Sequence, residues 1–288
     1  MISAYSFMTT TTIQKQGEEL NQLSRLLFNK AAGKWYSGIT VEIFAGILGI
    51  AIGIFNPTRD LRLILTISGF VLLAVRYGLR LWFENIYDRA ETMRRQSVLT
   101  ETLNWPISPS QFGEWRLKAG KKILDAFQLK SRDSDYYATQ EQAGSKRLLG
   151  VTLESAFWTR SLYTKISYWV WGLFLLFSFA TVLIISSASL EIIPQGIQSA
   201  IVYVIYLFLP ILLSVDLLGW GLRLNKLIAS IKEIECDLER LLQETDINEA
   251  KVMRLVSEYN CQVVQGFPIH NRLFTMWHDE IQRLWDRR

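Results

Sequence analysis

Apolar residues gather into four long runs along the chain, and polar residues fill the stretches between them. The longest run, residues 166–190, contains no charged residue. A helix rises about 1.5 Å per residue, so this run is longer than the roughly 30 Å hydrocarbon core of a bilayer. Arg160 and Lys165 precede it, and Trp169 and Trp171 lie in its first turns, as is typical of a membrane interface. The pattern predicts a membrane-spanning helix, and the alternative is a helix buried in a large soluble core.

Three further runs have the same character, at residues 38–55, 61–83 and 197–220. The first two are separated only by the polar segment 56–60, which contains Pro57 and predicts a tight turn. Two spans joined in this way form a helical hairpin. The fourth run follows the third after a short loop, so it predicts a second hairpin.

The polar stretches also carry helical periodicity. Residues 84–165 form a long insert in which helices are expected on either side of a Pro-rich break and a turn-rich segment. After the fourth run, six apolar residues recur in steps of three and four, which is the a/d pattern of a coiled coil: Leu224, Leu227, Ile231, Ile234, Leu238 and Leu241. The fourth span is therefore expected to continue beyond the membrane as one long helix, with the next helix folded back on its apolar stripe.

Together these patterns predict an all-α integral membrane protein. Four transmembrane helices form two hairpins, and a helical cytoplasmic domain consists of the central insert plus a C-terminal helical hairpin. The expected divisions are a cytoplasmic N-terminal helix at 1–36, hairpin 1 at 37–83, the insert at 84–165, hairpin 2 at 166–222 and a cytoplasmic C-terminal region at 223–288.

Charge sets the expected orientation. The chain is 50% hydrophobic with a formal net charge of +4, which fits a membrane domain plus a sizeable soluble part. Basic residues near the span ends lie mostly on the side of the termini and the insert, so the positive-inside rule places those parts in the cytoplasm. No cleavable signal peptide is expected at the N-terminus. The mild charge indicates contact with the lipid bilayer rather than with DNA or RNA.

Charged residues within the apolar runs are the first candidate site: Glu42, Arg76, Arg80 and Asp216. Placing a charged side chain within the hydrocarbon core of a bilayer costs roughly a few kcal/mol unless it is paired or hydrated. Opposite signs at similar depth predict an interhelical ion-pair cluster that acts as a gate or lines a pore. The alternative is that the arginines snorkel and the carboxylates lie among lipid headgroups.

Two apolar patterns are candidates for contact between copies of the chain. Ala45, Gly49 and Gly53 recur every four residues, which allows a second helix to approach closely in lipid. The heptad positions Leu227, Ile231, Ile234 and Leu238 form the second surface. Both patterns favour a homo-oligomer. For the small residues, the alternative is that a span simply tolerates them.

Motifs for catalysis and metal binding are absent from the sequence. It contains no HExxH, CxxC, GxSxG or P-loop motif. Cys236, Cys261, His270 and His278 do not have metal-ligand spacing. We therefore expect no catalytic residue, no metal and no cofactor, and a protein that is not an enzyme.

Basic and aromatic residues cluster in the insert, and they suggest a binding site for a nucleotide. Arginine and lysine bind phosphate, and an aromatic ring can stack on a base. The candidates are Arg94, Arg95, Tyr136, Tyr137, Lys146 and Arg147. The alternative is a solvated surface or one that faces lipid headgroups.

Two stretches resemble a known family. One is Tyr136-Tyr137 followed by Gly144 and the segment LESAFWTRSLY at 153–163, and the other runs from Tyr259 through Pro268-Ile269 to residues 281–285. With a cytoplasmic insert between two hairpins, the layout resembles the bacterial SMODS-associated four-transmembrane effectors of anti-phage defence.

The resemblance implies a multi-pass protein of the bacterial inner membrane. In such a system a partner cyclase makes a cyclic (oligo)nucleotide on infection, and the effector perforates or depolarises the membrane in abortive infection. The resemblance assigns no ligand-contacting residue. Two other functions fit the spans: a constitutive ion channel or transporter subunit, and a non-conducting membrane scaffold.

Overall fold

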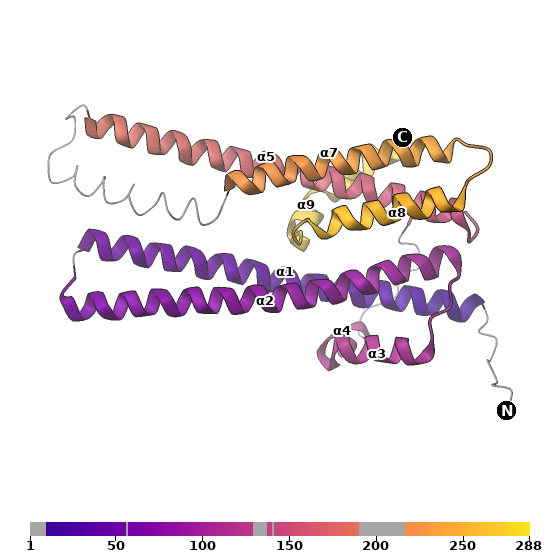
Figure 1. Cartoon of the computed structure of the whole chain (residues 1–288), viewed down its shortest axis with the longest axis horizontal. Coiled ribbons are helices and arrows are strands. Elements are labelled where there is room, and N and C mark those ends of the chain that lie inside the picture. The colour runs from indigo at the N-terminus through magenta and orange to yellow at the C-terminus, as the bar shows by residue number, and fades with distance from the viewer. Residues whose placement is uncertain (1–9, 56, 129–136, 140, 190–216) are drawn as a thin grey trace. The chain divides into compact units, whose positions relative to one another are not determined.

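The computed structural model describes residues 10–55, 57–128, 137–139, 141–189 and 217–288, and these residues contain only helices, turns and loops. The protein is all-α, as the sequence predicts. Figure 1 shows the eight described helices, which are α1 (Thr10–Phe55), α2 (Arg59–Leu103), α3 (Pro109–Ala119), α4 (Lys121–Gln128), α5 (Ser145–Ser189), α7 (Leu217–Leu242), α8 (Glu249–Val264) and α9 (Asn271–Asp286).

The chain folds into two compact units. Unit 1 comprises Met1–Ala32, Glu84–Leu162 and Leu227–Arg288, and unit 2 comprises Gly33–Phe83 and Tyr163–Lys226. Unit 1 thus combines the N-terminal helix, the insert and the C-terminal region of the sequence-based division, and unit 2 combines the two apolar hairpins. Helices α1, α2, α5 and α7 each contribute residues to both units.

Unit 1 has a conventional hydrophobic core. From α1, Leu20, Leu23 and Leu27 are at most 2% exposed, which matches their helical spacing along the chain. The heptad stripe of α7 is buried in the same unit, with Ile231 and Leu238 fully inaccessible. Helix α8 buries Val252, Leu255, Val256 and Tyr259. The stripe therefore packs within the chain, as expected for a helix that folds back after α7.

Helix α9 covers part of α5 in unit 1. Its Ile281 is fully buried against Phe157 and Leu162, and half-buried aromatic rings close around this cluster: Trp158, Phe274, Trp277 and Trp285. The apolar residues of α9 lie on one face. A helix this short is only marginally stable alone in water, so α9 depends on packing that face against α5.

Glycine and proline set the helix boundaries in the insert. The sequence predicts one helix over 113–130, but the structure has two. Helix α3 begins at Pro109 with Ser108 as its N-cap, since the Ser108 hydroxyl accepts a hydrogen bond from Gln111 N. Gly120 then adopts φ 83°, a left-handed value that separates α3 from α4.

Asp246 and Glu249 have the sequence spacing of a capping box, but α8 starts differently in the structure. The side chain of Asn248 accepts hydrogen bonds from Ala250 N and Lys251 N, so Asn248 is the N-cap. The segment from Thr245 to Asn248 lies outside the helices and forms the turn from α7 to α8.

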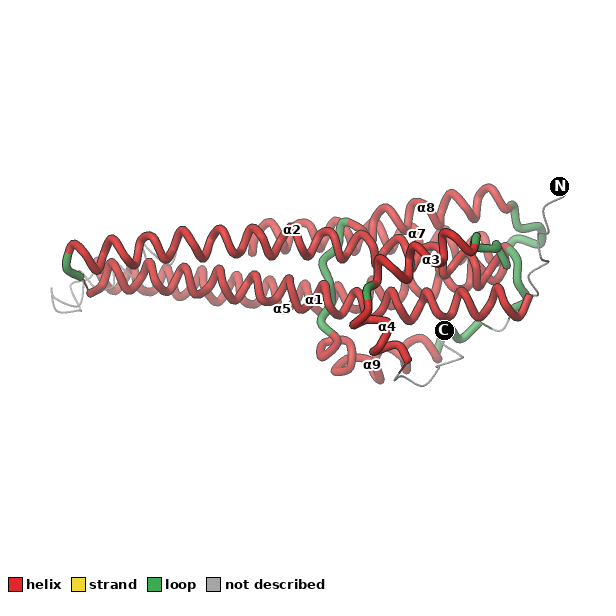
Figure 2. The backbone as a smooth tube through the Cα atoms, turned by 90° about the horizontal axis from the view of Figure 1, so that it is seen from below, coloured by secondary structure: helices red, strands yellow, loops and turns green. Residues whose placement is uncertain are grey.

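Unit 2 contains an antiparallel helical hairpin. Residues 33–55 of α1 and 59–83 of α2 lie side by side in both Figure 1 and Figure 2 and are joined by the short connection after Phe55. Parts of α5 and α7 complete the described portion of this unit. The sequence predicts four spans; among the residues searched, one helix, α2, is long and apolar enough to cross a membrane.

The two units differ in how many of their large apolar side chains are exposed. Of the exposed large apolar side chains in the described residues, six belong to unit 1: Trp105, Leu117, Leu242, Val264, Met276 and Leu284. All the others belong to unit 2 and include Phe44, Phe70 and Phe179, each about 60% exposed or more. Within the most apolar stretch of α2, no residue is buried.

Candidate functional site

An ion pair between α1 and α2 is the first candidate site. Arg76 Nε lies 3.2 Å from Glu42 Oε2, and the two side chains are 17% and 18% exposed. Both residues stand on the helical hairpin of unit 2, beside exposed apolar neighbours. The structure therefore brings together two of the four charged residues predicted to form a cluster.

The face of α1 that receives Arg76 is built from residues three and four apart. Trp35, Gly38 and Glu42 share that face because they are one and two helical turns apart. The Arg76 guanidinium carbon lies 5.7 Å from the centre of the Trp35 ring. A Cβ atom on Gly38 would lie 2.8 Å from Arg76 Nη1, so glycine provides the space that the guanidinium occupies.

The ion pair does not satisfy every hydrogen-bond donor of Arg76. Arg76 Nη1 is buried and has no hydrogen-bond partner among the described residues. A charge-assisted pair in an apolar setting is strong when both partners are present, and removal of either leaves an uncompensated charge. Arg80 lies one turn further along α2 and is exposed, and Asp216 is outside the described residues.

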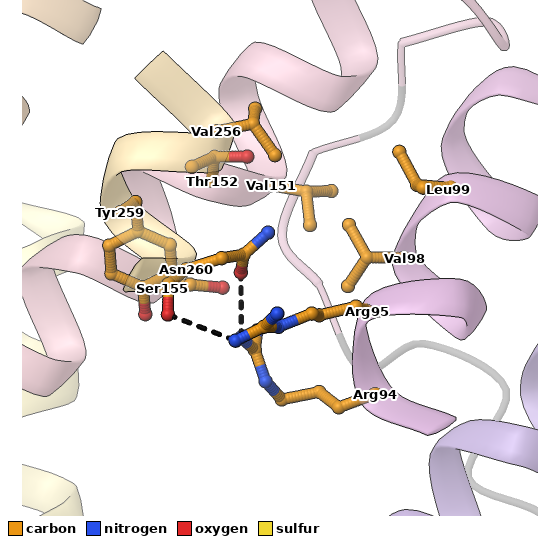
Figure 3. Close-up of a pocket in the computed structure, with 10 residues that line it drawn as sticks. All are labelled: Arg94, Arg95, Val98, Leu99, Val151, Thr152, Ser155, Val256, Tyr259 and Asn260. Carbon is orange, nitrogen blue, oxygen red and sulfur yellow. Dashed lines mark hydrogen bonds between the residues drawn. The ribbon is translucent and has the colours of Figure 1, made fainter. Parts of the chain in front are cut away.

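The second candidate site lies in unit 1, where α2, α5 and α8 meet around two arginines (Figure 3). Glu91 receives hydrogen bonds from Arg94 at 2.6 and 2.9 Å and from Arg95 at 3.0 Å. Both arginines also reach α8: Arg94 Nη2 donates to Asn260 Oδ1 at 2.8 Å and Arg95 Nη2 donates to the Asn260 carbonyl at 3.2 Å.

Burial and charge act against each other in this cluster. Burial alone raises the pKa of Glu91, but the hydrogen bonds and charges of Arg94 and Arg95 outweigh it and hold that pKa below its usual value. Burial lowers the pKa of Arg94, and the bonds to Glu91 more than compensate. Tyr87 has a raised pKa because it is buried beside Glu91. Two guanidinium groups and one carboxylate leave the cluster with one excess positive charge.

The space beside the arginines is small. Its lining residues come from α2 (Arg94, Arg95, Val98, Leu99), α5 (Val151, Thr152, Ser155) and α8 (Val256, Tyr259, Asn260). The cavity measures about 10 Å³, room for about one water molecule. In this conformation the arginines bind Glu91 and Asn260, and a nucleotide would require the helices to separate.

Two other predicted nucleotide-binding residues, Lys146 and Arg147, are not part of that cavity lining. Lys146 forms an ion pair with Glu141 at 2.8 Å, and Arg147 Nη1 donates to the Glu141 carbonyl at 3.3 Å. Tyr137 makes a smaller contribution than Glu91 to the raised pKa of Arg94. Tyr136 lies outside the described residues.

Sequence reasoning found the two arginines but missed Glu91 and Asn260. Glu91 precedes Arg94 and Arg95 by three and four residues, a spacing that favours ion pairs on a helix and could have been noticed. Asn260 comes from α8, and no local pattern in the sequence links it to α2.

The predicted oligomerisation residues have two different environments. Leu227, Ile231, Ile234 and Leu238 are each less than 9% exposed within the single chain, so their burial requires no second copy. By contrast, a Cβ atom on Gly49 would meet nothing within 4 Å. Ala45 is half-buried, and the burial of Gly53 is outside the described part of the structure.

The histidines have structural roles. His270 is the N-cap of α9 and accepts a hydrogen bond from Arg272 N through Nδ1 at 3.1 Å. His278 packs against Trp158 and Phe274 and contacts Asp279. Among the described residues, no group of three His, Cys, Asp or Glu side chains is placed to hold a metal ion.

Comparison with models of protein families, with curated proteins and with solved structures found no match.

Proposed function

We propose that this chain is an integral membrane protein with unit 2 in the lipid bilayer and unit 1 in water. The many large apolar side chains that unit 2 exposes are the observation that carries the proposal. Exposed apolar surface is unfavourable in water by about 25 cal/mol per Å², and it is favourable in contact with lipid chains. A helix of a soluble core would instead bury its apolar face.

Four spans are the arrangement we propose for unit 2. Helix α2 meets the length and composition required of a span. The apolar runs at 38–55, 166–190 and 197–220 supply the others, although the last lies mainly outside the described residues. Four spans place both termini and the insert on one side, and the positive-inside rule makes that side the cytoplasm of a bacterial cell.

The activity we propose is ligand-triggered permeabilisation or depolarisation of the inner membrane in anti-phage defence. Unit 1 senses a cyclic nucleotide or a partner protein, and the helices that unit 1 shares with unit 2 transmit the change. The layout of the sequence and the excess positive charge around Arg94 and Arg95 support this role. A homo-oligomer formed through the face of Ala45 and Gly49 provides the lesion.

The Glu42–Arg76 pair is the gate in this proposal. Because the two residues join α1 to α2, separation of these helices requires the pair to break or exchange partners. Glu42→Ala removes the carboxylate and is expected to raise basal dye leakage from proteoliposomes at equal protein content. Leakage equal to that of the parent removes the pair from the mechanism.

Dye release from proteoliposomes containing the full chain tests the function. We expect cyclic dinucleotides or trinucleotides to start leakage from vesicles that are otherwise tight. Leakage without any nucleotide favours a constitutive channel, and tight vesicles under all conditions favour a scaffold.

A pair of double variants tests where the nucleotide binds. Arg95→Ala/Lys146→Ala removes two candidate phosphate contacts and is expected to abolish the response. Lys121→Ala/Lys122→Ala removes two exposed cations of α4 and should leave it intact. An equal response from both variants places the ligand elsewhere.

A further inference from the structure

Charged residues lie at two levels along the apolar helices of unit 2. In the part of α2 that belongs to unit 2, residues 59–83, Arg59 and Arg62 lie at one end and Arg80 lies near the other. The 21 positions from Arg59 to Arg80 correspond to about 31 Å of helix, close to the thickness of a bilayer's hydrocarbon core. Between these levels α2 exposes apolar side chains such as Ile64, Phe70 and Leu73.

Three contacts show that four helix segments share the level of Arg80. Lys34 Nζ of α1 lies 3.9 Å from the centre of the Trp82 ring of α2. Trp35 of α1 stacks on Trp220 of α7, with ring centres 5.7 Å apart. Ser167 of α5 donates a hydrogen bond to Asn225 of α7 at 2.9 Å.

Five cations occupy this level, and we call them the basic rim: Lys34, Arg80, Lys165, Arg223 and Lys226. Of these, Arg80, Arg223 and Lys226 are exposed. The described residues of unit 2 contain two carboxylates. Glu42 is paired with Arg76, and Asp60 lies at the opposite end of the hairpin. Glu84 follows at the boundary of this unit, four residues after Arg80, so five cations against this one nearby described carboxylate leave an excess of positive charge at the level of the basic rim.

Exposed amphipathic rings accompany these cations. Tyr77, Trp82, Tyr168 and Trp169 are between 51% and 73% exposed. Tyrosine and tryptophan favour the headgroup level because one part of the ring system is apolar and another forms hydrogen bonds with water. Cations and exposed aromatic rings at one level, one bilayer thickness from the other end, define a surface for phospholipid headgroups.

We propose that the basic rim binds the headgroups of anionic phospholipids, such as phosphatidylglycerol, in preference to zwitterionic ones. This inference rests on the proposed placement of unit 2 in a bilayer. Each Lys or Arg near an anionic lipid surface strengthens the attraction by about fivefold. A headgroup phosphate at this level meets both the cations and the apolar helix below them, whereas a free phosphate compound meets only the cations.

Brominated lipids measure this preference, because bromine quenches nearby tryptophan fluorescence. The full chain is reconstituted in vesicles of equal parts phosphatidylcholine and phosphatidylglycerol, with bromine on the acyl chains of one lipid or the other. We expect brominated phosphatidylglycerol to quench more strongly. Equal quenching by the two lipids overturns the proposal.

Matched double variants assign the preference to the basic rim. Arg80→Gln/Arg223→Gln is expected to lower it by about fivefold or more, and added salt should reduce the wild-type preference in the same direction. Arg59→Gln/Arg62→Gln removes the same charges from the opposite end and should retain the preference. An equal loss in both variants contradicts a site at the basic rim.

Two further experiments distinguish headgroup binding from binding of free phosphate and from failure of membrane insertion. Excess inorganic phosphate at constant ionic strength should leave the lipid preference unchanged; abolition of the preference would mean that the basic rim binds free phosphate and would overturn the lipid assignment. Insertion into pure phosphatidylcholine vesicles tests the proposed function separately. A chain that inserts and responds there, but shows no preference in mixed vesicles, fails the headgroup proposal alone.

Discussion

At the scale of single residues, three glycines set how closely side chains from neighbouring helices approach. A Cβ atom added to Gly17 would lie 2.6 Å from Glu101 Cγ. One added to Gly38 would lie 2.8 Å from Arg76 Nη1, and one added to Gly221 would lie 2.9 Å from Trp171 Cε2. None of the three needs glycine for its backbone angles, because all lie within helices. The missing side chain is what these positions require.

Gly38→Ala should destabilise unit 2. The added methyl group overlaps the Arg76 guanidinium and displaces it from Glu42, at a cost of about 1–3 kcal/mol. Gly78→Ala is the control, because nothing lies within 4 Å of a Cβ at that position and alanine favours the helix. Thermal unfolding in detergent should show a lower midpoint for Gly38→Ala only; an unchanged midpoint contradicts the close approach.

Glu101 makes the stability of unit 1 depend on pH. Burial raises its pKa to about 7 despite hydrogen bonds from Ser97 and Asn21; Glu18 adds to the shift and Arg147 opposes it. The folded chain therefore binds this proton more tightly than the unfolded chain, so stability falls as pH rises from about 4.5 to about 7.

Glu101→Gln should remove that loss, because the amide stays neutral throughout. The difference between variant and parent should grow with pH and reach about 3 kcal/mol above neutrality. Unfolding midpoints measured from acid to alkaline pH provide the comparison. Parallel curves for the two proteins rule out a buried, protonated Glu101.

At the scale of helices, two buried carboxylates join elements that are far apart in the sequence. Glu91 is 3% exposed and holds the arginines that reach α8. Glu235 of α7 is 2% exposed and accepts hydrogen bonds from Arg160 of α5 and Arg288 after α9, each at 2.5 Å. Such carboxylates position helices, since their charge requires partners in a fixed place.

Glu91→Ala should destabilise unit 1 by about 3–5 kcal/mol, because it leaves a buried arginine without its counter-charge. Glu114→Ala removes an exposed carboxylate from a pair with Lys118 one helical turn away and should change stability by less than about 0.5 kcal/mol. Chemical denaturation of both variants tests the difference. Similar small effects would show that the Glu91 cluster is not a structural centre.

Ile281 holds α9 in place. Ile281→Ala leaves a cavity between α9 and Phe157 and should cost about 2–5 kcal/mol, with earlier cleavage of α9 in limited proteolysis. Leu284 is 49% exposed on the same helix, so Leu284→Ala provides the control. Equal cleavage rates would contradict the packing of α9 through Ile281.

Local sequence signals predicted most helices but not all of their ends. Leu20, Leu23, Leu26 and Leu27 have helical spacing, and the structure buries all of them but Leu26, which is half-buried. Heptad spacing located the stripe of α7, and residues of the same chain bury it, as expected for a helix that folds back after α7. The break at Gly120 was missed because apolar periodicity continues through it, and a positive φ leaves no sign in that pattern.

At the scale of the whole molecule, the two units differ in their exposed surface. Most of the exposed large apolar side chains among the described residues belong to unit 2. The two cysteines, Cys236 and Cys261, are exposed and both belong to unit 1, so the native chain carries two probes of its orientation.

In the proposed topology, a membrane-impermeant maleimide should label these cysteines in inverted vesicles but not in intact spheroplasts. A cysteine-free variant carrying Thr58→Cys in the connection between α1 and α2 should show the opposite pattern. Labelling of the native cysteines from outside would reverse the orientation, and labelling of both sets from one side would contradict a spanning hairpin.

The sequence by itself determined the helical class, the apolar segments and the polar insert, because these depend on periodicity and composition within a few turns of helix. It also identified Glu42 and Arg76 as charges in need of partners, and Arg94 and Arg95 as candidate nucleotide contacts. Only the tertiary structure decided what those partners are. Arg94 pairs with Asn260, and Arg76 occupies the space beside Gly38, only because packing brings their helices together. No local pattern in the sequence encodes which distant helix face a side chain will contact.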